Sequence, residues 1–92
     1  MNPGNRRYRC RSGEIEVAVD SAEQWHALAV CIGRPELAYA GAWDVVHTAP
    51  ADGATAAVVQ EMLSEDDASV WARRFEANGV PFLVIQPDAT SH

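Results

Sequence analysis

Apolar residues alternate with polar ones near the start of the chain and form an unbroken run near its end. In residues 14–19, Ile15, Val17 and Val19 lie on one face, and acidic or small residues lie on the other. This alternation predicts a strand with one face in solvent. Residues 80–86 show no polar alternation. They are therefore predicted to form a strand that is covered on both faces.

Between these two strands the apolar residues have helical spacing. Three main helices are predicted, at about residues 21–32, 54–63 and 65–78. The first carries an apolar stripe that starts at Trp25 and repeats at i+3, i+4 and i+7, and Gly33 is placed to end it. Ser64 is the expected N-cap of the third, because the three acidic residues that follow it would face the positive end of the helix dipole.

Two terminal strands with helices between them predict an α+β domain. The ends of the chain would pair side by side, and the helices would cover one face of a small antiparallel sheet. A two-stranded sheet is marginal alone, so a third strand is expected at 45–46, at 8–10 or from a partner. The chain of 92 residues is long enough for one modest core. We expect a flexible leader at 1–7, one domain at 8–86 and a flexible tail at 87–92.

The charge of the chain is divided between a basic start and an acidic remainder. The first eleven residues contain four of the seven arginines and no acid, whereas the whole chain has a net charge of −6. A chain this acidic repels phosphate backbones, so nucleic acid is not an expected partner. The basic start is interpreted as a solvated arm. As the alternative, Arg9 and Arg11 are candidates for contacting an anion such as a phosphate group.

The composition is that of a globular chain rather than a disordered or membrane-spanning one. Apolar residues make up 48% of it and the mean hydropathy is −0.17. No apolar stretch approaches the ~20 residues that a membrane-spanning helix needs. No hydrophobic run follows the first charges, as it would in a secretory signal. We therefore expect a cytoplasmic location and no membrane partner.

Few residues of this sequence are candidates for catalytic chemistry. His47 lies in the irregular segment 38–53, close to Trp43, and is a candidate base. Cys10 is the other candidate, although with Cys31 it has neither the pattern of a disulfide framework nor the spacing of a zinc site. No cluster of His, Cys, Asp and Glu has metal-ligand spacing. No metal is predicted, and no residue is assigned as catalytic.

Four phrases of the sequence, in this order and spacing, resemble one enzyme family. They are Tyr-x-x-x-x-Gly-Glu from Tyr8, Trp-x-x-Leu from Trp25, Gly-Arg-Pro-Glu-Leu from Gly33, and Trp-x-x-x-Phe-x-x-Asn-Gly-Val-Pro from Trp71. Together they are similar to the small domain of the family III coenzyme A transferases. That family includes formyl-CoA and carnitine-CoA transferases and α-methylacyl-CoA racemases. The resemblance covers roughly residues 8–86.

The resemblance implies a role within a larger enzyme. In this family a large domain carries the catalytic residues, an aspartate in the transferases, and the small domain caps the acyl-CoA cleft. We therefore expect a small domain that closes this cleft, is inactive alone and binds no cofactor tightly. Its expected partner is the large domain or a dimer mate, and the assembled enzyme would bind a coenzyme A thioester. The resemblance leaves both transfer and racemisation open.

The sequence departs from the family pattern at two places. The glycine-rich loop that covers the reacting carbonyl in the transferases would fall at Met1–Gly4, which holds a single glycine. After Gly-Arg-Pro-Glu-Leu the family continues with an acid, an aromatic residue and an arginine. Here Trp43 stands at the aromatic position, and no arginine occurs between Arg34 and Arg73. A ligand contact inherited from that arginine is therefore in doubt.

Two alternatives to a small domain of a larger enzyme stay open. The chain would be an accessory module derived from this domain that acts with a separate partner, or an independent enzyme that uses His47 or Cys10.

Overall fold

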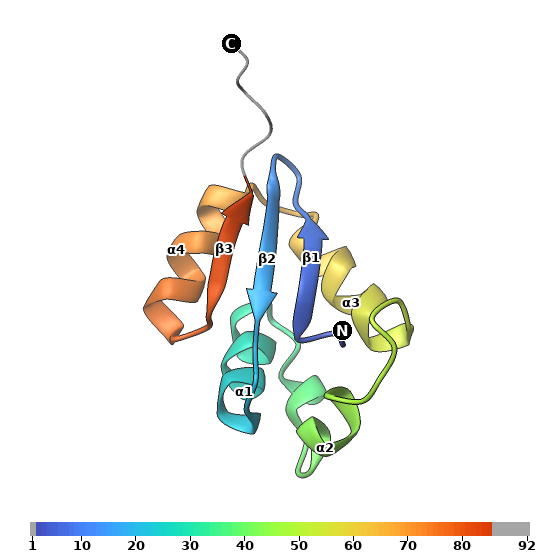
Figure 1. Ribbon diagram of the computed structural model, residues 1–92. Coiled ribbons are helices and arrows are strands. Elements are labelled where there is room, and N and C mark those ends of the chain that lie inside the picture. The colour runs from blue at the N-terminus through green and yellow to red at the C-terminus, as the bar shows by residue number, and fades with distance from the viewer. Residues whose placement is uncertain (1, 86–92) are drawn as a thin grey trace.

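A three-stranded antiparallel sheet, with helices on one side, forms the framework of the computed structural model, which describes residues 2–85 (Figure 1). The elements follow in the order β1 (Asn5–Arg9), β2 (Glu14–Ala18), α1 (Ala22–Cys31), the 3-10 turn η1 (Pro35–Ala38), α2 (Ala42–Val46), α3 (Ala54–Leu63), α4 (Ala68–Asn78) and β3 (Phe82–Ile85). The predicted α+β class is confirmed. The predicted tail at 87–92 lies outside the described residues.

The central strand β2 joins the two ends of the chain. A tight hairpin connects it to β1, with Tyr8 opposite Ile15, and β3 returns on its other side with Phe82 opposite Val17. The bond from the Cys10 amide to the Gly13 carbonyl, at 3.0 Å, closes the hairpin. The expected pairing of the two chain ends is therefore confirmed.

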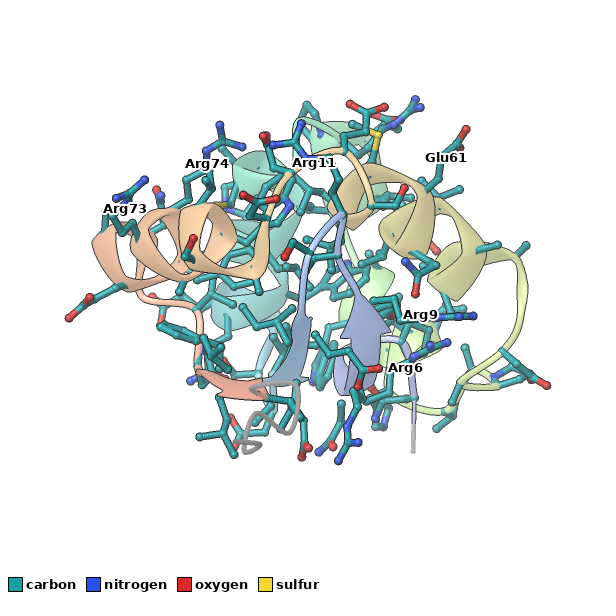
Figure 2. All side chains as sticks on the ribbon, turned by 90° about the horizontal axis from the view of Figure 1, so that it is seen from above. Arg6, Arg9, Arg11, Glu61, Arg73 and Arg74 are labelled. Carbon is teal, nitrogen blue, oxygen red and sulfur yellow. The ribbon has the colours of Figure 1, made fainter. Side chains whose placement is uncertain are left out.

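The two faces of the sheet differ in what covers them. The helices lie on one side of the sheet (Figure 2), and Tyr8, Ile15 and Val17 point into the core on that side. On the outer face Leu83 is 61% exposed, opposite Glu16. The prediction that the final strand is covered on both faces is therefore wrong. An unbroken apolar run does not distinguish full burial from a strand with one exposed apolar side chain.

The third strand is β1, which confirms the expectation at 8–10 and extends it. The strand begins at Asn5, so residues 5–7 belong to the sheet and not to a leader outside the domain. The arginines in this segment led to the prediction of a solvated arm. In the structure Tyr8 is the one fully buried residue of β1, so the strand carries almost no hydrophobic pattern in the sequence. The alternative strand at 45–46 is wrong, because these residues close α2, with Val46 buried and Val45 exposed.

The predicted helix bounds hold except at the start of α4. The helix begins at Ala68, with Asp67 as its N-cap, and not at 65. The Ser64 hydroxyl donates to the Glu61 carbonyl at 2.7 Å and so satisfies the C-terminal end of α3 instead. A serine between two helices can bond a carbonyl of the first as readily as an amide of the second.

One apolar cluster holds the sheet and the helices together. Its largest fully buried side chains include Trp25, Tyr8, Phe75, Ile15 and Leu28. Each such burial contributes roughly 1.5–3 kcal/mol relative to exposure. None of the helices within residues 2–85 is long and apolar enough to cross a membrane.

Candidate functional site

The residues that precede β1 pack against α2 at one end of the sheet. The Gly4 amide donates to Asn2 Oδ1 at 2.8 Å, and Asn2 Nδ2 donates to the His47 carbonyl at 3.2 Å. A Cβ atom on Gly4 would lie 3.1 Å from the Trp43 ring and 3.1 Å from Val19 Cβ, closer than most real Cβ contacts. The segment 2–4 and the part of α2 that carries Trp43 therefore form one surface, although about forty residues separate them.

Trp43 and His47, both predicted site residues, are neighbours on this surface. The Trp43 ring is half-buried, with its centroid 6.3 Å from that of Trp25 and 5.7 Å from that of His47. His47 Nδ1 lies 2.8 Å from the Trp43 carbonyl oxygen. Because a carbonyl only accepts, Nδ1 carries the proton, and in the neutral ring Nε2 holds the lone pair.

His47 lacks the arrangement of a catalytic base paired with a nucleophile. Such pairs need a hydroxyl, thiol or carboxylate within hydrogen-bond distance of the imidazole. Within residues 2–85 the His47 ring bonds only the carbonyl of Trp43. In the structure the His47 ring bonds the Trp43 carbonyl at the C-terminal end of α2 and lies tilted against the Trp43 ring.

An open hollow of about 400 Å³ lies next to Trp43. The hollow is lined by small residues and by four ring-bearing side chains. These are Trp25 and His26 of α1, Tyr39 after η1, and Trp43 of α2. Apolar hollows with a few polar groups suit an apolar or planar part of a ligand. Tyr39 was not singled out from the sequence. Tyr39 is a large aromatic residue with 56% of its surface exposed, and this exposure becomes visible only in the folded structure.

Arg9 and Arg11, the other predicted candidates, lie toward the opposite end of β1. Arg11 Nε lies 3.2 Å from Asp67 Oδ1, and the Arg11 amide bonds the Asp66 carbonyl at 2.9 Å. Arg11 therefore ties the hairpin to the start of α4. Arg9 follows the edge of the sheet, where Gln60 holds its backbone. The structure does not bring either arginine to Trp43 and His47.

The two cysteines are poor nucleophiles in this fold. Burial, and then the negative charges of Asp67 and Glu14, raise the pKa of Cys10 to about 11. Burial also raises the pKa of Cys31, partly opposed by Arg74. Both thiols are therefore protonated at neutral pH. Within the part of the chain that the structure describes, no three His, Cys, Asp or Glu side chains are grouped to hold a metal ion.

The fold and this site define a small α+β domain with a candidate surface where its N-terminal segment meets α2. The model of CoA-transferase family III matches residues 1–90, and the chain therefore belongs to that family.

Two solved structures share the fold of this chain. Both are crystal structures of Rv3272 from Mycobacterium tuberculosis, one in an orthorhombic form and one of a point mutant. The first has 19% identity and a TM-score of 0.74, and the second has 20% identity and a TM-score of 0.73. The matches cover 98% of this chain but only 26% and 25% of those chains. A comparison with curated proteins finds no match.

Proposed function

We propose that this chain is the small domain of a family III CoA transferase or acyl-CoA racemase, and that it closes the acyl-CoA cleft of a large domain. The observation that carries the proposal is the packing of Gly4 against Trp43 beside an apolar hollow. In the family resemblance, the loop before β1 covers the reacting carbonyl. This chain has only the short segment 2–4 in place of that glycine-rich loop, and the contact of Gly4 with Trp43 supports a role for this segment at the cleft.

Closing a cleft serves catalysis by excluding water from the reacting thioester and by holding the substrate in place. The segment 2–4 and Trp43 suit this task, because they offer a glycine backbone and an aromatic face rather than charged groups. The large domain would supply the nucleophile, because in the family resemblance that domain carries the catalytic aspartate. The two thiols of this chain are protonated, and the His47 ring bonds only the carbonyl of Trp43 within the described residues. The chain alone would therefore be inactive.

The partner of this domain would be the large domain of the same kind of enzyme, or a dimer mate. The chain spans about a quarter of the length of the Rv3272 structures that it matches. Three quarters of such a chain would therefore be available to form the rest of the cleft.

A titration of the chain with CoA and with acetyl-CoA, followed by nuclear magnetic resonance, tests the proposal. We expect the indole N–H signal of Trp43 and the amide signal of Gly4 to shift. The indole of Trp71 is an internal control, because it is buried and donates to the Leu63 carbonyl at 2.9 Å on another part of the molecule. Shifts that avoid both Gly4 and Trp43 would overturn the assignment of this surface.

An activity assay tests the second part of the proposal. The isolated chain should exchange CoA between two acyl groups no faster than buffer does. Exchange at enzymatic rates would show an independent enzyme, and His47→Ala and Cys10→Ala would then identify its chemical group. Capture of a stable, separately encoded partner instead of a large domain would favour the accessory module.

A further inference from the structure

The arginines of this chain fall into two groups according to what neutralises them. Four of the seven arginines form ion pairs with an acid at 3.2–3.6 Å: Arg7, Arg11, Arg34 and Arg74. Within residues 2–85, Arg6, Arg9 and Arg73 have no carboxylate within 4 Å. The chain has thirteen acidic residues, so the missing partners are not explained by a shortage of carboxylates.

Two of these unneutralised arginines line the same hollow. It has a volume of about 420 Å³ beside the free edge of β1 and is lined by Arg6, Arg7, Tyr8, Arg9, Glu14 and Gln60. Three guanidinium groups and one carboxylate give it a formal charge of +2, in a chain whose net charge is −6. Glu14 lies 3.6 Å from Arg7, so the remaining positive charge comes from Arg6 and Arg9. Like charges held around one hollow attract an anion.

Arg6 is held in place before any ligand arrives. Its Nε donates to the Arg7 carbonyl at 2.9 Å and its Nη1 donates to the Ala51 carbonyl at 2.7 Å. Its guanidinium carbon lies 4.2 Å from the centre of the Tyr8 ring. Burial raises the pKa of Tyr8 above its ordinary range, so this ring stays neutral. A fixed guanidinium loses little side-chain entropy when it binds an oxyanion.

Arg9 supplies the second set of donors from the same strand edge. Its backbone is fixed by Gln60, whose Oε1 accepts from the Arg9 amide at 3.0 Å and whose Nε2 donates to the Arg9 carbonyl at 2.6 Å. Its side chain is exposed. Figure 2 shows the side chains of Arg6 and Arg9 at the same edge of the molecule, and Arg73 at the other.

We infer that this hollow binds a phosphoryl anion between Arg6 and Arg9. Planar guanidinium groups bind phosphate oxygens through two parallel N–H donors, and one phosphate group can engage both arginines. The phosphates of CoA would be the natural source, and this part of the inference rests on the proposed function. Arg6 lies only two residues, about 7 Å along an extended strand, from Gly4. One ligand could therefore reach both the anion hollow and the surface around Trp43.

Titrations with sodium pyrophosphate at low ionic strength test the anion site without any CoA chemistry. We expect the amide and side-chain signals of Arg6 and Arg9 to shift. Arg9→Gln should weaken the affinity about tenfold, the usual loss for one charge-assisted contact. Arg73→Gln is the matched control, because it removes the same charge from another unpaired arginine away from the hollow, and it should change the affinity less than about twofold.

Two results would overturn the anion site. One is the absence of shifts at Arg6 and Arg9. The other is an equal loss of affinity in Arg9→Gln and Arg73→Gln, which would show a diffuse charge effect. Arg9→Lys provides a second variant: it keeps the charge but loses the fork of donors, so it should bind more weakly than the wild type and more tightly than Arg9→Gln.

A comparison of CoA with dephospho-CoA identifies the source of the phosphate. Tighter binding of CoA, with the difference lost in Arg9→Gln, would support its 3′-phosphate as the occupant. Binding of pyrophosphate without any CoA-induced shift at Arg9 would overturn the CoA assignment and leave a site for a free phosphate. Shifts at Trp43 from acetyl-CoA with none at Arg6 and Arg9 would overturn the anion site while leaving the proposed function in place.

Discussion

At the residue scale, the candidate surface depends on the absence of a side chain at Gly4, which lets the segment 2–4 pack against Trp43. A Cβ atom at position 4 would approach both the Trp43 ring and Val19 to 3.1 Å, so one of the neighbours has to move. Gly4→Ala should therefore lower the free energy of unfolding by about 1–3 kcal/mol, the usual cost of overpacking. Urea denaturation measures this loss, and the indole signal of Trp43 reports the displacement.

Gly53→Ala is the control for this substitution. Gly53 has a φ of −85°, and its nearest contact for an added Cβ is 3.5 Å, an ordinary van der Waals distance. Gly53 is the N-cap of α3, where alanine is less favourable than glycine, so Gly53→Ala should cost up to about 1 kcal/mol and leave the Trp43 signal in place. If both variants were equally stable and the Trp43 signal stayed in place, the segment 2–4 would not pack on α2.

Cys10 allows a test of whether the chain holds a reactive thiol. Burial, Asp67 and Glu14 raise its pKa from 9.0 to about 11, and only the thiolate is nucleophilic. In a Cys31→Ser background, alkylation of the folded chain by iodoacetamide at pH 8 should be about 100-fold slower than alkylation of the urea-unfolded chain. The rate should then rise as the pH approaches 11.

The same shift sets the sign of the pH dependence of stability. The folded state favours the neutral thiol, so the contribution of Cys10 is complete below its unfolded pKa of about 9 and is lost as the pH rises through about 11. Equal alkylation rates for the folded and unfolded chain at pH 8 would contradict this account. They would bring Cys10 back as a candidate nucleophile.

At the scale of elements, the free edge of β1 is closed by one local backbone bond and by side chains, and not by another strand. The Asn5 amide donates to the Asn2 carbonyl at 2.9 Å, and Arg6 Nε donates to the Arg7 carbonyl at 2.9 Å. Gln60 from α3 takes both backbone groups of Arg9. Exposed strand edges are templates for pairing with other chains, so these bonds keep the edge unavailable.

Gln60→Ala should open this edge and loosen α3 from the sheet. It removes two hydrogen bonds, which predicts a loss of about 1–2 kcal/mol of stability and faster hydrogen exchange of the Arg9 amide. Glu61→Ala is the neighbouring control on the same helix. The Glu61 side chain is exposed and points away from β1 (Figure 2), so its loss should be close to neutral. Equal exchange of the Arg9 amide in both variants would rule out this role for Gln60.

Sequence pattern predicted most elements of this fold because their signals are local. Trp25 and its stripe defined α1, and the alternation around Ile15 defined β2. The start of α4 was missed because Ser64 has two bonding choices that only the packed chain decides. The first residues of β1 were missed because a strand with one buried side chain, Tyr8, has almost no hydrophobic pattern.

The candidate site was less predictable because it depends on contacts between distant residues. Trp43 and His47 were predicted as candidate site residues because they lie in an irregular segment of the sequence. The structure shows that Gly4 packs against Trp43. Arg9 and Arg11 looked equivalent in the sequence. The fold separates them, since Arg11 meets Asp67 whereas Arg9 shares a hollow with Arg6. Which arginine finds an acid is a property of tertiary structure, and no spacing rule reports it.

At the scale of the whole molecule, the three tryptophans lie on three different helices and all contact the same hydrophobic core. Trp25 of α1 and Trp71 of α4 are buried in the same apolar cluster, and Trp43 of α2 packs against it. Their indole groups also bridge elements, since Trp25 Nε1 donates to the Leu37 carbonyl at 2.8 Å. With a single cluster shared by sheet and helices, loss of any layer exposes the others. We therefore expect the sheet and the helices within residues 2–85 to unfold in one cooperative step.

Urea titrations followed by tryptophan fluorescence and by far-ultraviolet circular dichroism test this cooperativity. The two curves should coincide, with a slope of roughly 1–1.5 kcal/mol per molar urea for a chain of this size. A double variant, Trp25→Phe with Trp71→Phe, separates the signals further, because it leaves Trp43 as the remaining tryptophan and thus as the reporter of the α2 surface. An earlier transition at Trp43 would show that this surface opens before the core. In that case α2 and the segment 2–4 would open locally, and the cooperative unit would consist of the sheet with α1, α3 and α4.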